Sequence, residues 1–203
     1  MSSLNEENKK KKAIESKKKK LKRKKPIWCE EQIDDVVKSP KKTTLSQTEM
    51  KDEAYKRKTP DIKWVPPQSP LKLLQEAHYH DPWKVMVICM LLNKSTGLKA
   101  RSVISELFRI CPDAKACTRA STNTLEQVIH GIGFQKQRAA RLKRFSEEYL
   151  GKHWTHVTQL HGIGKYGADA YAIFCTGKWQ RVTPADNYLD RYWEFLHDIK
   201  DTL

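Results

Sequence analysis

Residues 160–174 read LHGIGKYGADAYAIF, in which a Gly-x-Gly turn joins an apolar segment to an amphipathic helix. The glycines permit positive φ and leave no Cβ in the way of an approaching backbone. The helix that follows presents its first unpaired N–H groups and the positive end of its dipole. Together these features predict a seat for a phosphate, beside which Lys165 adds a positive charge. An ordinary glycine-containing connection between two helices is the alternative.

The tetrapeptide HGIG occurs twice, at 130–133 and at 161–164, each time after an apolar residue that would close a helix. Two such turns are too few for a solenoid, which needs at least about three repeats to bury its faces. They indicate two specialised loops.

Helical periodicity extends on both sides of the hairpin. Ser69-Pro70 and Asp81-Pro82 each place a capping residue before a proline, which is a signal for a helix start. The second pair leads into VMVICMLL, a run apolar enough for a central buried helix. No segment shows the convincing alternation of a strand, so the sequence predicts an all-α fold. The predicted helices lie within 69–80, 81–93, 97–112, 121–133, 136–153, 165–177 and 187–200.

Residues 1–60 differ in composition from the rest of the chain. They hold 19 Lys and Arg residues against 10 Asp and Glu, which is +9 of the net charge of +15, with lysine-rich blocks at 9–12, 17–20 and 22–25. So much charge with so few apolar residues cannot offset the entropy lost on folding. We therefore predict a disordered basic tail over 1–60 and one folded domain over 61–203, which is long enough to bury its own core.

The longest apolar run, 85–92, is far too short to span a bilayer, and the N-terminus has no apolar segment of signal-peptide type. We therefore expect a soluble, intracellular protein with no membrane partner. No heptad repeat or spare apolar face indicates a homo-oligomer, so a monomer is expected. Five scattered cysteines favour buried thiols over a disulfide framework. They are Cys29, Cys89, Cys111, Cys117 and Cys175.

Five motifs occur in order along the chain: WVPPQSPLKLLQEAHYHDPWK at 64–84, LNKSTG at 92–97, RFSEEYL at 144–150, the hairpin at 160–174 and PADNYLDRY at 184–192. Together they resemble the helix-hairpin-helix DNA glycosylases, and within them the mismatch-specific thymine DNA glycosylases. The resemblance covers essentially the whole folded part. It implies a two-lobed helical fold and an enzyme of base excision repair that removes thymine or uracil opposite guanine from duplex DNA. Lysine blocks of the kind found in the tail suit nuclear import, so the nucleus is the expected location.

Base excision requires that the nucleotide be rotated out of the stack. Cleavage passes through an oxocarbenium-like sugar, which an ionised carboxylate can stabilise. The resemblance assigns this role to Asp186, 22 residues beyond Gly164. Asp190 is the rival on the same helical face, and a helix N-cap is the alternative role for Asp186. Thr183 and Ala185 stand where the family is expected to have histidine and glutamate around the proline.

Bifunctional members of the superfamily carry a hairpin lysine that attacks the sugar and forms a Schiff base. That lysine corresponds to Tyr166, and Lys165 occupies the preceding position. The resemblance therefore implies a monofunctional glycosylase, with Tyr166 lining the base pocket. It also implies that the hairpin contacts the DNA backbone through Gly162, Gly164, Lys165 and Gly167.

The remaining site residues follow from the same resemblance. Gln75 falls on a pocket position, where an amide can meet both donor and acceptor edges of a pyrimidine; the helix surface is the alternative. Leu74 and Tyr188 belong to the same predicted pocket. Phe134 falls where an apolar residue fills the vacated stack, with burial in the core as the alternative. Lys94 falls on a strand-probing turn where the family usually has arginine, whose planar fork lysine cannot form.

No cofactor or metal is expected. Many relatives carry a four-cysteine iron-sulfur cluster after the aspartate, and this chain has no cysteine beyond Cys175. The histidines do not show a metalloenzyme spacing. The expected partner is double-stranded DNA with a mismatched or deaminated base. Two other functions remain open: a DNA-binding module in which Asp186 is only a cap, and a bifunctional glycosylase/lyase.

Overall fold

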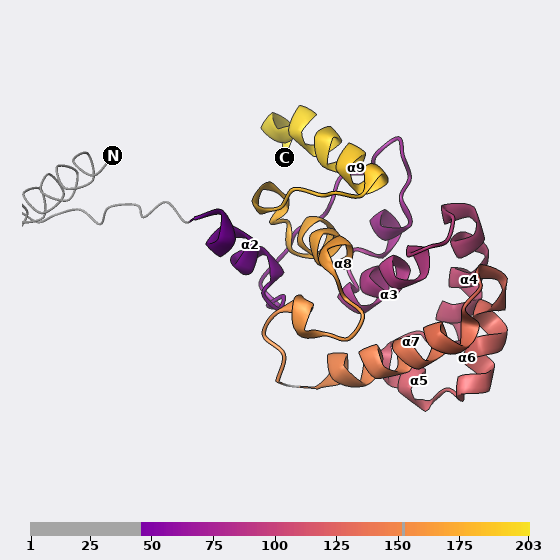
Figure 1. Cartoon of the computed structure of the whole chain (residues 1–203). Coiled ribbons are helices and arrows are strands. Elements are labelled where there is room, and N and C mark those ends of the chain that lie inside the picture. The colour runs from indigo at the N-terminus through magenta and orange to yellow at the C-terminus, as the bar shows by residue number, and fades with distance from the viewer. Residues whose placement is uncertain (1–45, 152) are drawn as a thin grey trace, which may run out of the picture. The chain divides into compact units, whose positions relative to one another are not determined.

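The computed structural model describes residues 46–151 and 153–203, and Figure 1 shows them as a set of helices. Within this part of the chain there is no strand, and the one isolated bridge joins Lys56 to His156. The predicted all-α class is confirmed. The α-helices are α2 (Gln47–Tyr55), α3 (Pro82–Leu92), α4 (Gly97–Ile110), α5 (Ala114–Arg119), α6 (Thr122–Ile129), α7 (Gln135–Leu150), α8 (Lys165–Ala170) and α9 (Asn187–Asp198).

Short helices of other types connect them. A π-helix, η4 (Tyr171–Thr176), continues α8. The 3₁₀ helices are η1 (Leu74–His78), η2 (His130–Ile132), η3 (Val157–Gln159), η5 (Trp179–Arg181) and η6 (Lys200–Thr202).

Helix α3 is the central element. Its start follows the prediction, since the Asp81 carboxylate accepts a hydrogen bond from the Lys84 N–H (3.2 Å) and Pro82 occupies the first position. Seven of its eleven residues are buried, so it is covered on nearly every side. It contacts α4 and α7 on one hand and η1, α8 and η4 on the other. A helix that is apolar all round is expected in such a place.

The helices around α3 form two groups, as Figure 1 shows. In the first group, α7 packs against α5 and α6, and α4 packs against α6. In the second group, α8 and η4 contact α3, and α9 packs on η4 through Tyr192, whose ring lies 4.6 Å from that of Phe174. The two-lobed helical fold is therefore confirmed, with α3 shared by both lobes.

The predicted helix over 69–80 is wrong for most of its length, because only η1 forms there. The carboxylate of Glu76 turns back and accepts hydrogen bonds from the Ser69 N–H (2.7 Å), the Ser69 hydroxyl (2.7 Å) and the Leu73 N–H (2.6 Å). These bonds stabilise a loop rather than a regular helix. The loop brings Gln75 into the interior, where it is 3% exposed.

The N-terminal boundary of the folded domain also requires a correction. Helix α2 precedes the predicted boundary at residue 60 and contacts η4 and η5. Ala54 is fully buried, and the Lys178 ammonium donates to the Glu53 carbonyl (2.8 Å). Helix α2 has no broad apolar stripe and is held by a few tertiary contacts. The composition of the sequence therefore does not reveal it. Residues 1–45, which make up the rest of the predicted tail, lie outside the described residues.

The four described cysteines are free thiols in the interior, as predicted; they are Cys89, Cys111, Cys117 and Cys175. Cys29 lies outside the described residues. None of the described helices has the length and apolar character needed to cross a membrane.

Candidate active site

Three adjoining cavities lie where the hairpin, the turn after α3 and the start of α9 meet. The loop cleft, of about 430 Å³, is lined in part by Asn93, Lys94, Phe134, Arg138, Arg141 and Gly162. The hairpin cleft, of about 390 Å³, is lined in part by Met90, Lys94, Gly164, Lys165, Tyr166 and Asp186. The apolar pocket, of about 680 Å³, is lined in part by Leu74, Gln75, Leu98, Tyr166, Asp186 and Tyr188.

Asp186 is the N-cap of α9. Its Oδ1 accepts hydrogen bonds from the N–H groups of Tyr188 (3.2 Å) and Leu189 (3.1 Å). No hydrogen bond among the described residues ends at Oδ2. The side chain lines both the hairpin cleft and the apolar pocket. The cap that the sequence offers as an alternative role is therefore present, and it leaves one carboxylate oxygen available at the junction of two cavities.

The rival carboxylate, Asp190, lies one turn further along α9. Its backbone N–H donates to the Asp186 carbonyl (2.8 Å), so it is inside the helix and not at its cap. Asp190 lines neither the hairpin cleft nor the apolar pocket. Position thus favours Asp186 as the carboxylate that faces the cavities.

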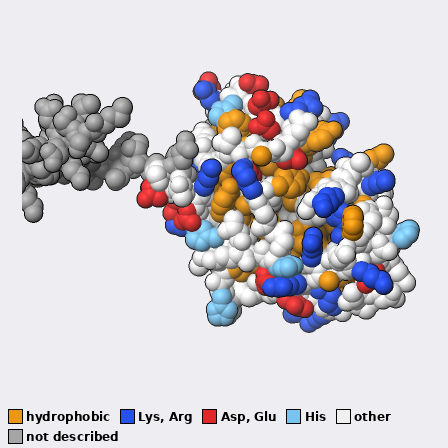
Figure 2. All heavy atoms as spheres, in the orientation of Figure 1, with side chains coloured by type: hydrophobic (Ala, Val, Ile, Leu, Met, Phe, Trp, Pro, Cys, Tyr) orange, Lys and Arg blue, Asp and Glu red, His pale blue; other side chains and the backbone are white. Residues whose placement is uncertain are grey.

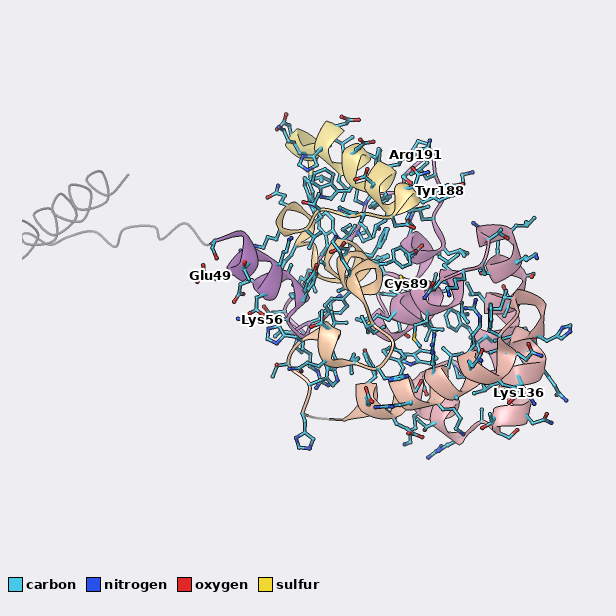
Figure 3. The ribbon with its side chains drawn as sticks, viewed as in Figure 1. Glu49, Lys56, Cys89, Lys136, Tyr188 and Arg191 are labelled. Atoms are coloured by element: carbon cyan, nitrogen blue, oxygen red, sulfur yellow. The ribbon has the colours of Figure 1, made fainter. Side chains whose placement is uncertain are left out.

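Gln75 and Tyr166 form a hydrogen-bonded pair on the wall of the apolar pocket. The Gln75 Nε2 donates to the Tyr166 hydroxyl (3.0 Å) and lies 3.7 Å from the Cys89 Sγ. Burial raises the pKa of Tyr166 well above its usual value and that of Cys89 to about 12, so both groups are neutral near neutral pH. The helix-surface alternative for Gln75 is therefore wrong. Figure 3 shows Cys89 within α3 and Tyr188 at the start of α9.

Leu74 and Tyr188 both line the apolar pocket, so the structure brings together the four residues that the sequence assigned to a base pocket. Tyr188 is 61% exposed and accessible from solvent. A pocket with apolar walls, one amide and one neutral phenol can hold an uncharged planar ring by packing and by a few directed hydrogen bonds.

Lys165 is held by the protein itself. Its ammonium donates to the Asp169 carboxylate and to the Thr183 carbonyl. Asp169 is 1% exposed and also accepts a hydrogen bond from the Tyr55 hydroxyl of α2 (2.6 Å). Thr183 lies three residues before Asp186, so Lys165 anchors the segment that leads into α9. An ammonium has three donors, and the predicted contact with a DNA phosphate stays a prediction.

The hairpin has the geometry that its glycines indicate. Gly162 has φ 81°, and a Cβ there would lie 3.0 Å from the Met90 Cε. Gly164 is the N-cap of α8 and provides no side chain to bond the first N–H groups of that helix. Gly164 and Gly167 both line the hairpin cleft. The free N–H groups at the start of α8 can donate to a phosphate oxygen in place of a capping side chain.

Lys94 and Phe134 protrude from two loops that flank the loop cleft. Both have left-handed backbone conformations, with φ 59° at Lys94 and φ 52° at Phe134. Phe134 is 61% exposed, so the alternative that places it in the core is wrong. A large apolar side chain held out into solvent on a strained backbone is unusual and indicates a function for the loop.

Three residues of the site were missed by the sequence analysis: Tyr55, Arg138 and Asp169. Asp169 follows Lys165 by four residues on one helix, and this spacing alone could have indicated the ion pair. Tyr55 and Arg138 carry no comparable signal, because Asp169 lies 114 residues from Tyr55 and three of the four acceptors of Arg138 lie 45 to 48 residues from it.

The sequence model for the HhH-GPD superfamily base excision DNA repair protein matches residues 87–202. The chain belongs to this family. The match covers α4 to α9, most of α3, the hairpin and Asp186, so the resemblance drawn from the five motifs is confirmed for the family.

Curated relatives agree with the HhH-GPD assignment. A methyl-CpG-binding domain protein 4-like protein of Arabidopsis thaliana is 57% identical over 152 residues, which are 75% of this chain and 34% of the relative. A thymine/uracil-DNA glycosylase of Pyrobaculum aerophilum is 29% identical over 105 residues, 48% of this chain and 46% of the relative. A thymine-DNA glycosylase of Aeropyrum pernix is 29% identical over 104 residues, 48% and 47% of the two chains. The chain thus spans between about a third and a half of the length of these relatives.

Proposed function

We propose that this HhH-GPD protein is a monofunctional DNA glycosylase of base excision repair, which hydrolyses the N-glycosidic bond of thymine or uracil mispaired with guanine. The observation that carries the proposal is the position of Asp186. Its carboxylate lies at the junction of the hairpin cleft and the apolar pocket, beside the Gln75–Tyr166 pair. Two relatives named as thymine or thymine/uracil DNA glycosylases support the choice of base.

The reaction begins with rotation of the target nucleotide out of the duplex. The apolar pocket, of about 680 Å³, has room for a pyrimidine and its sugar. Gln75 and Tyr166 are placed to bond the polar edge of the base. Phe134 fills the gap left in the stack and offsets part of the cost of unstacking. Lys94 probes the duplex from the turn after α3.

Bond cleavage follows within the pocket. The C1′–N bond breaks and its electron pair goes to the leaving base, while a water oxygen attacks C1′ and loses a proton to solvent. The base anion takes up a proton from solvent, so that water is added across the bond. The Asp186 carboxylate stabilises the positive charge on the sugar and orients the water, and the products are free base and an abasic site. The Oδ2 oxygen is suited to this role, since the cap hydrogen bonds use Oδ1.

Two observations favour a monofunctional enzyme over a lyase. The hairpin position of the nucleophilic lysine holds Tyr166, which has no amine. The Lys165 ammonium is bonded to Asp169 and to the Thr183 carbonyl, and a charged ammonium is not a nucleophile.

Duplex DNA is the proposed partner. Figure 2 shows Lys and Arg side chains distributed around apolar surface on the face in view. The loop cleft and the hairpin cleft are lined by three exposed cations, Lys94, Arg141 and Lys165. This arrangement suits a strand of phosphates on either side of an inserted apolar residue. We further propose that the protein acts in the nucleus as a monomer.

The proposal is tested by single-turnover base release from duplexes that carry one G:T, G:U, G:C or A:T pair, each assayed with and without alkali. We expect release from G:T and G:U only, with strand breaks only after alkali and no covalent complex with borohydride. Breaks without alkali, together with a borohydride-trapped complex, would show a lyase. Binding to all four duplexes with no release would show a DNA-binding module.

A further inference from the structure

Arg138 is a buried cation with an unusual set of partners. It lies on α7 and is 8% exposed, and no acidic side chain of the described residues forms an ion pair with it. Four hydrogen bonds from its guanidinium end at main-chain carbonyls. The acceptors are Gly133 (2.9 Å), Met90 (3.0 Å), Leu91 (3.1 Å) and Asn93 (2.8 Å).

Two of these carbonyls lie immediately before residues with a left-handed backbone conformation. The Asn93 carbonyl belongs to the peptide that leads into Lys94, and the Gly133 carbonyl belongs to the peptide that leads into Phe134. Because a peptide is planar, fixing its carbonyl oxygen also fixes the N–H that begins the next residue. Lys94 and Phe134 are two of the three described non-glycine residues with positive φ, and a strained backbone of this kind persists only where its surroundings hold it.

The guanidinium is a rigid plane with five N–H donors in a fixed geometry. Two of its hydrogen bonds end at Met90 and Leu91 in the last turn of α3, one at Asn93 in the turn that follows, and one at Gly133 in the loop before α7. The guanidinium therefore sets the distance and angle between the two loops, with the end of α3 as a fixed base. Lys94 follows α3 and Phe134 precedes α7, so the two residues come from segments about forty residues apart. Their side chains both line the loop cleft, together with Arg138 itself.

We propose that Arg138 is a positioning residue that joins the Lys94 turn and the Phe134 loop into one preformed unit for engaging duplex DNA. The proposal rests on the proposed function. Arg138 acts on the base-flipping step through Lys94 and Phe134, and it does not touch the reacting atoms. Holding both loops in place before DNA binds removes the entropic cost of ordering them during unstacking.

The first test uses the free protein and needs no activity. The Ser95 N–H bonds the Leu92 carbonyl and the Gly133 N–H bonds the His130 carbonyl, so these two amides report on the two loops. In Arg138→Lys we expect hydrogen exchange at both amides to become about tenfold faster or more. Arg141→Met is the matched control, because Arg141 is exposed on the same helix and lines the same cleft. Its exchange rates should equal those of the wild type.

The second test measures base flipping and base release. With a G:T duplex that carries 2-aminopurine beside the thymine, Arg138→Lys should lower the fluorescence rise on flipping and slow single-turnover release about tenfold or more. Its affinity for a matched duplex should change less than about threefold, because its charge is retained. Arg141→Met should instead weaken binding to the matched duplex and reduce its salt dependence by about one counterion.

A double-mutant cycle distinguishes positioning from general loss of structure. If Arg138 acts through Phe134, adding Arg138→Lys to Phe134→Ala should slow release far less than it does in the wild type. Equal slowing in both backgrounds would overturn the proposal, as would unchanged exchange at Ser95 and Gly133. If the wild type releases no base, the proposed function fails, while the exchange result still decides whether Arg138 joins the loops.

Discussion

At the scale of single residues, the site depends on side chains that have two tasks. Asp186 caps α9 with one carboxylate oxygen and presents the other to the cavities. Lys165 neutralises buried Asp169 and also anchors the Thr183 carbonyl. Asp186, Gln75 and Tyr166 were identified from motifs, because short-range spacing carries their signal. Arg138 could not be distinguished in the sequence from Arg141 or Arg144, because which arginine is buried depends on distant carbonyls.

The Gln75–Tyr166 pair gives a prediction at this scale. Tyr166→Phe removes the phenol that accepts the Gln75 hydrogen bond (3.0 Å) and leaves a buried amide donor without that partner. We expect the free energy of unfolding to fall by about 1 to 3 kcal/mol and base release from a G:T duplex to slow, as measured by urea denaturation and single-turnover kinetics. Tyr188→Phe, at an exposed position, should leave the free energy of unfolding unchanged. Equal stability of the two variants would contradict the importance of the pair.

At the scale of elements, the sequence predicts regular helices well and irregular ones poorly. Helices α3, α4, α6, α7 and α9 lie close to the ranges that helical periodicity predicts. The helix predicted over 69–80 is wrong because the Glu76 carboxylate accepts hydrogen bonds from the N–H groups of Ser69 and Leu73 and stabilises a loop. Helix α2 was missed because its contacts are tertiary. The Tyr55 hydroxyl of α2 donates a hydrogen bond to Asp169 and so connects α2 to the helix of the hairpin.

This connection predicts that α2 contributes to the stability of the site. Tyr55→Phe deletes a 2.6 Å hydrogen bond to a buried carboxylate, and hydrogen bonds to charged groups contribute about 1.5 to 3 kcal/mol. We expect a loss of that size in the free energy of unfolding, measured by urea denaturation. Tyr79→Phe serves as a control, since no hydrogen bond of the Tyr79 hydroxyl occurs among the described residues. A loss below about 0.5 kcal/mol in Tyr55→Phe would show that α2 is only loosely attached.

At the scale of the whole molecule, two helical lobes share α3, and the cavities open where segments of both lobes meet. The fold class and family follow from the sequence, because helical periodicity and ordered motifs are properties of the chain itself. The relation between the Lys94 turn and the Phe134 loop does not follow from the sequence, since it depends on the Arg138 side chain of α7 that reaches the end of α3. The interior also contains several tyrosines, and burial opposes the ionisation of their hydroxyl groups.

These tyrosines predict how stability depends on pH. Burial raises the pKa of Tyr166, Tyr171 and Tyr192 far above the usual value, and that of Tyr149 to about 12. Above pH about 10 the unfolded chain loses these protons while the folded protein keeps them. The free energy of unfolding should therefore be constant with respect to these groups below pH 10 and fall above it. Each group contributes about 1.4 kcal/mol per pH unit.

Urea denaturation between pH 8 and about 11.5 measures this fall. In Tyr171→Phe the free energy of unfolding should fall less steeply with pH, because one buried tyrosine hydroxyl no longer contributes. A free energy of unfolding that stays flat to pH about 11.5 would contradict the assignment of these phenols to the interior.

The central claim, that the Asp186 carboxylate carries the chemistry, is tested most directly by single-turnover thymine release from a G:T duplex in Asp186→Asn. Asparagine is a good N-cap, so α9, the melting temperature and the affinity for DNA should be preserved. We predict that release falls by at least about a hundredfold, while Asp190→Asn retains the wild-type rate. Release by Asp186→Asn at close to the wild-type rate, or an equal loss in Asp190→Asn, would contradict the account.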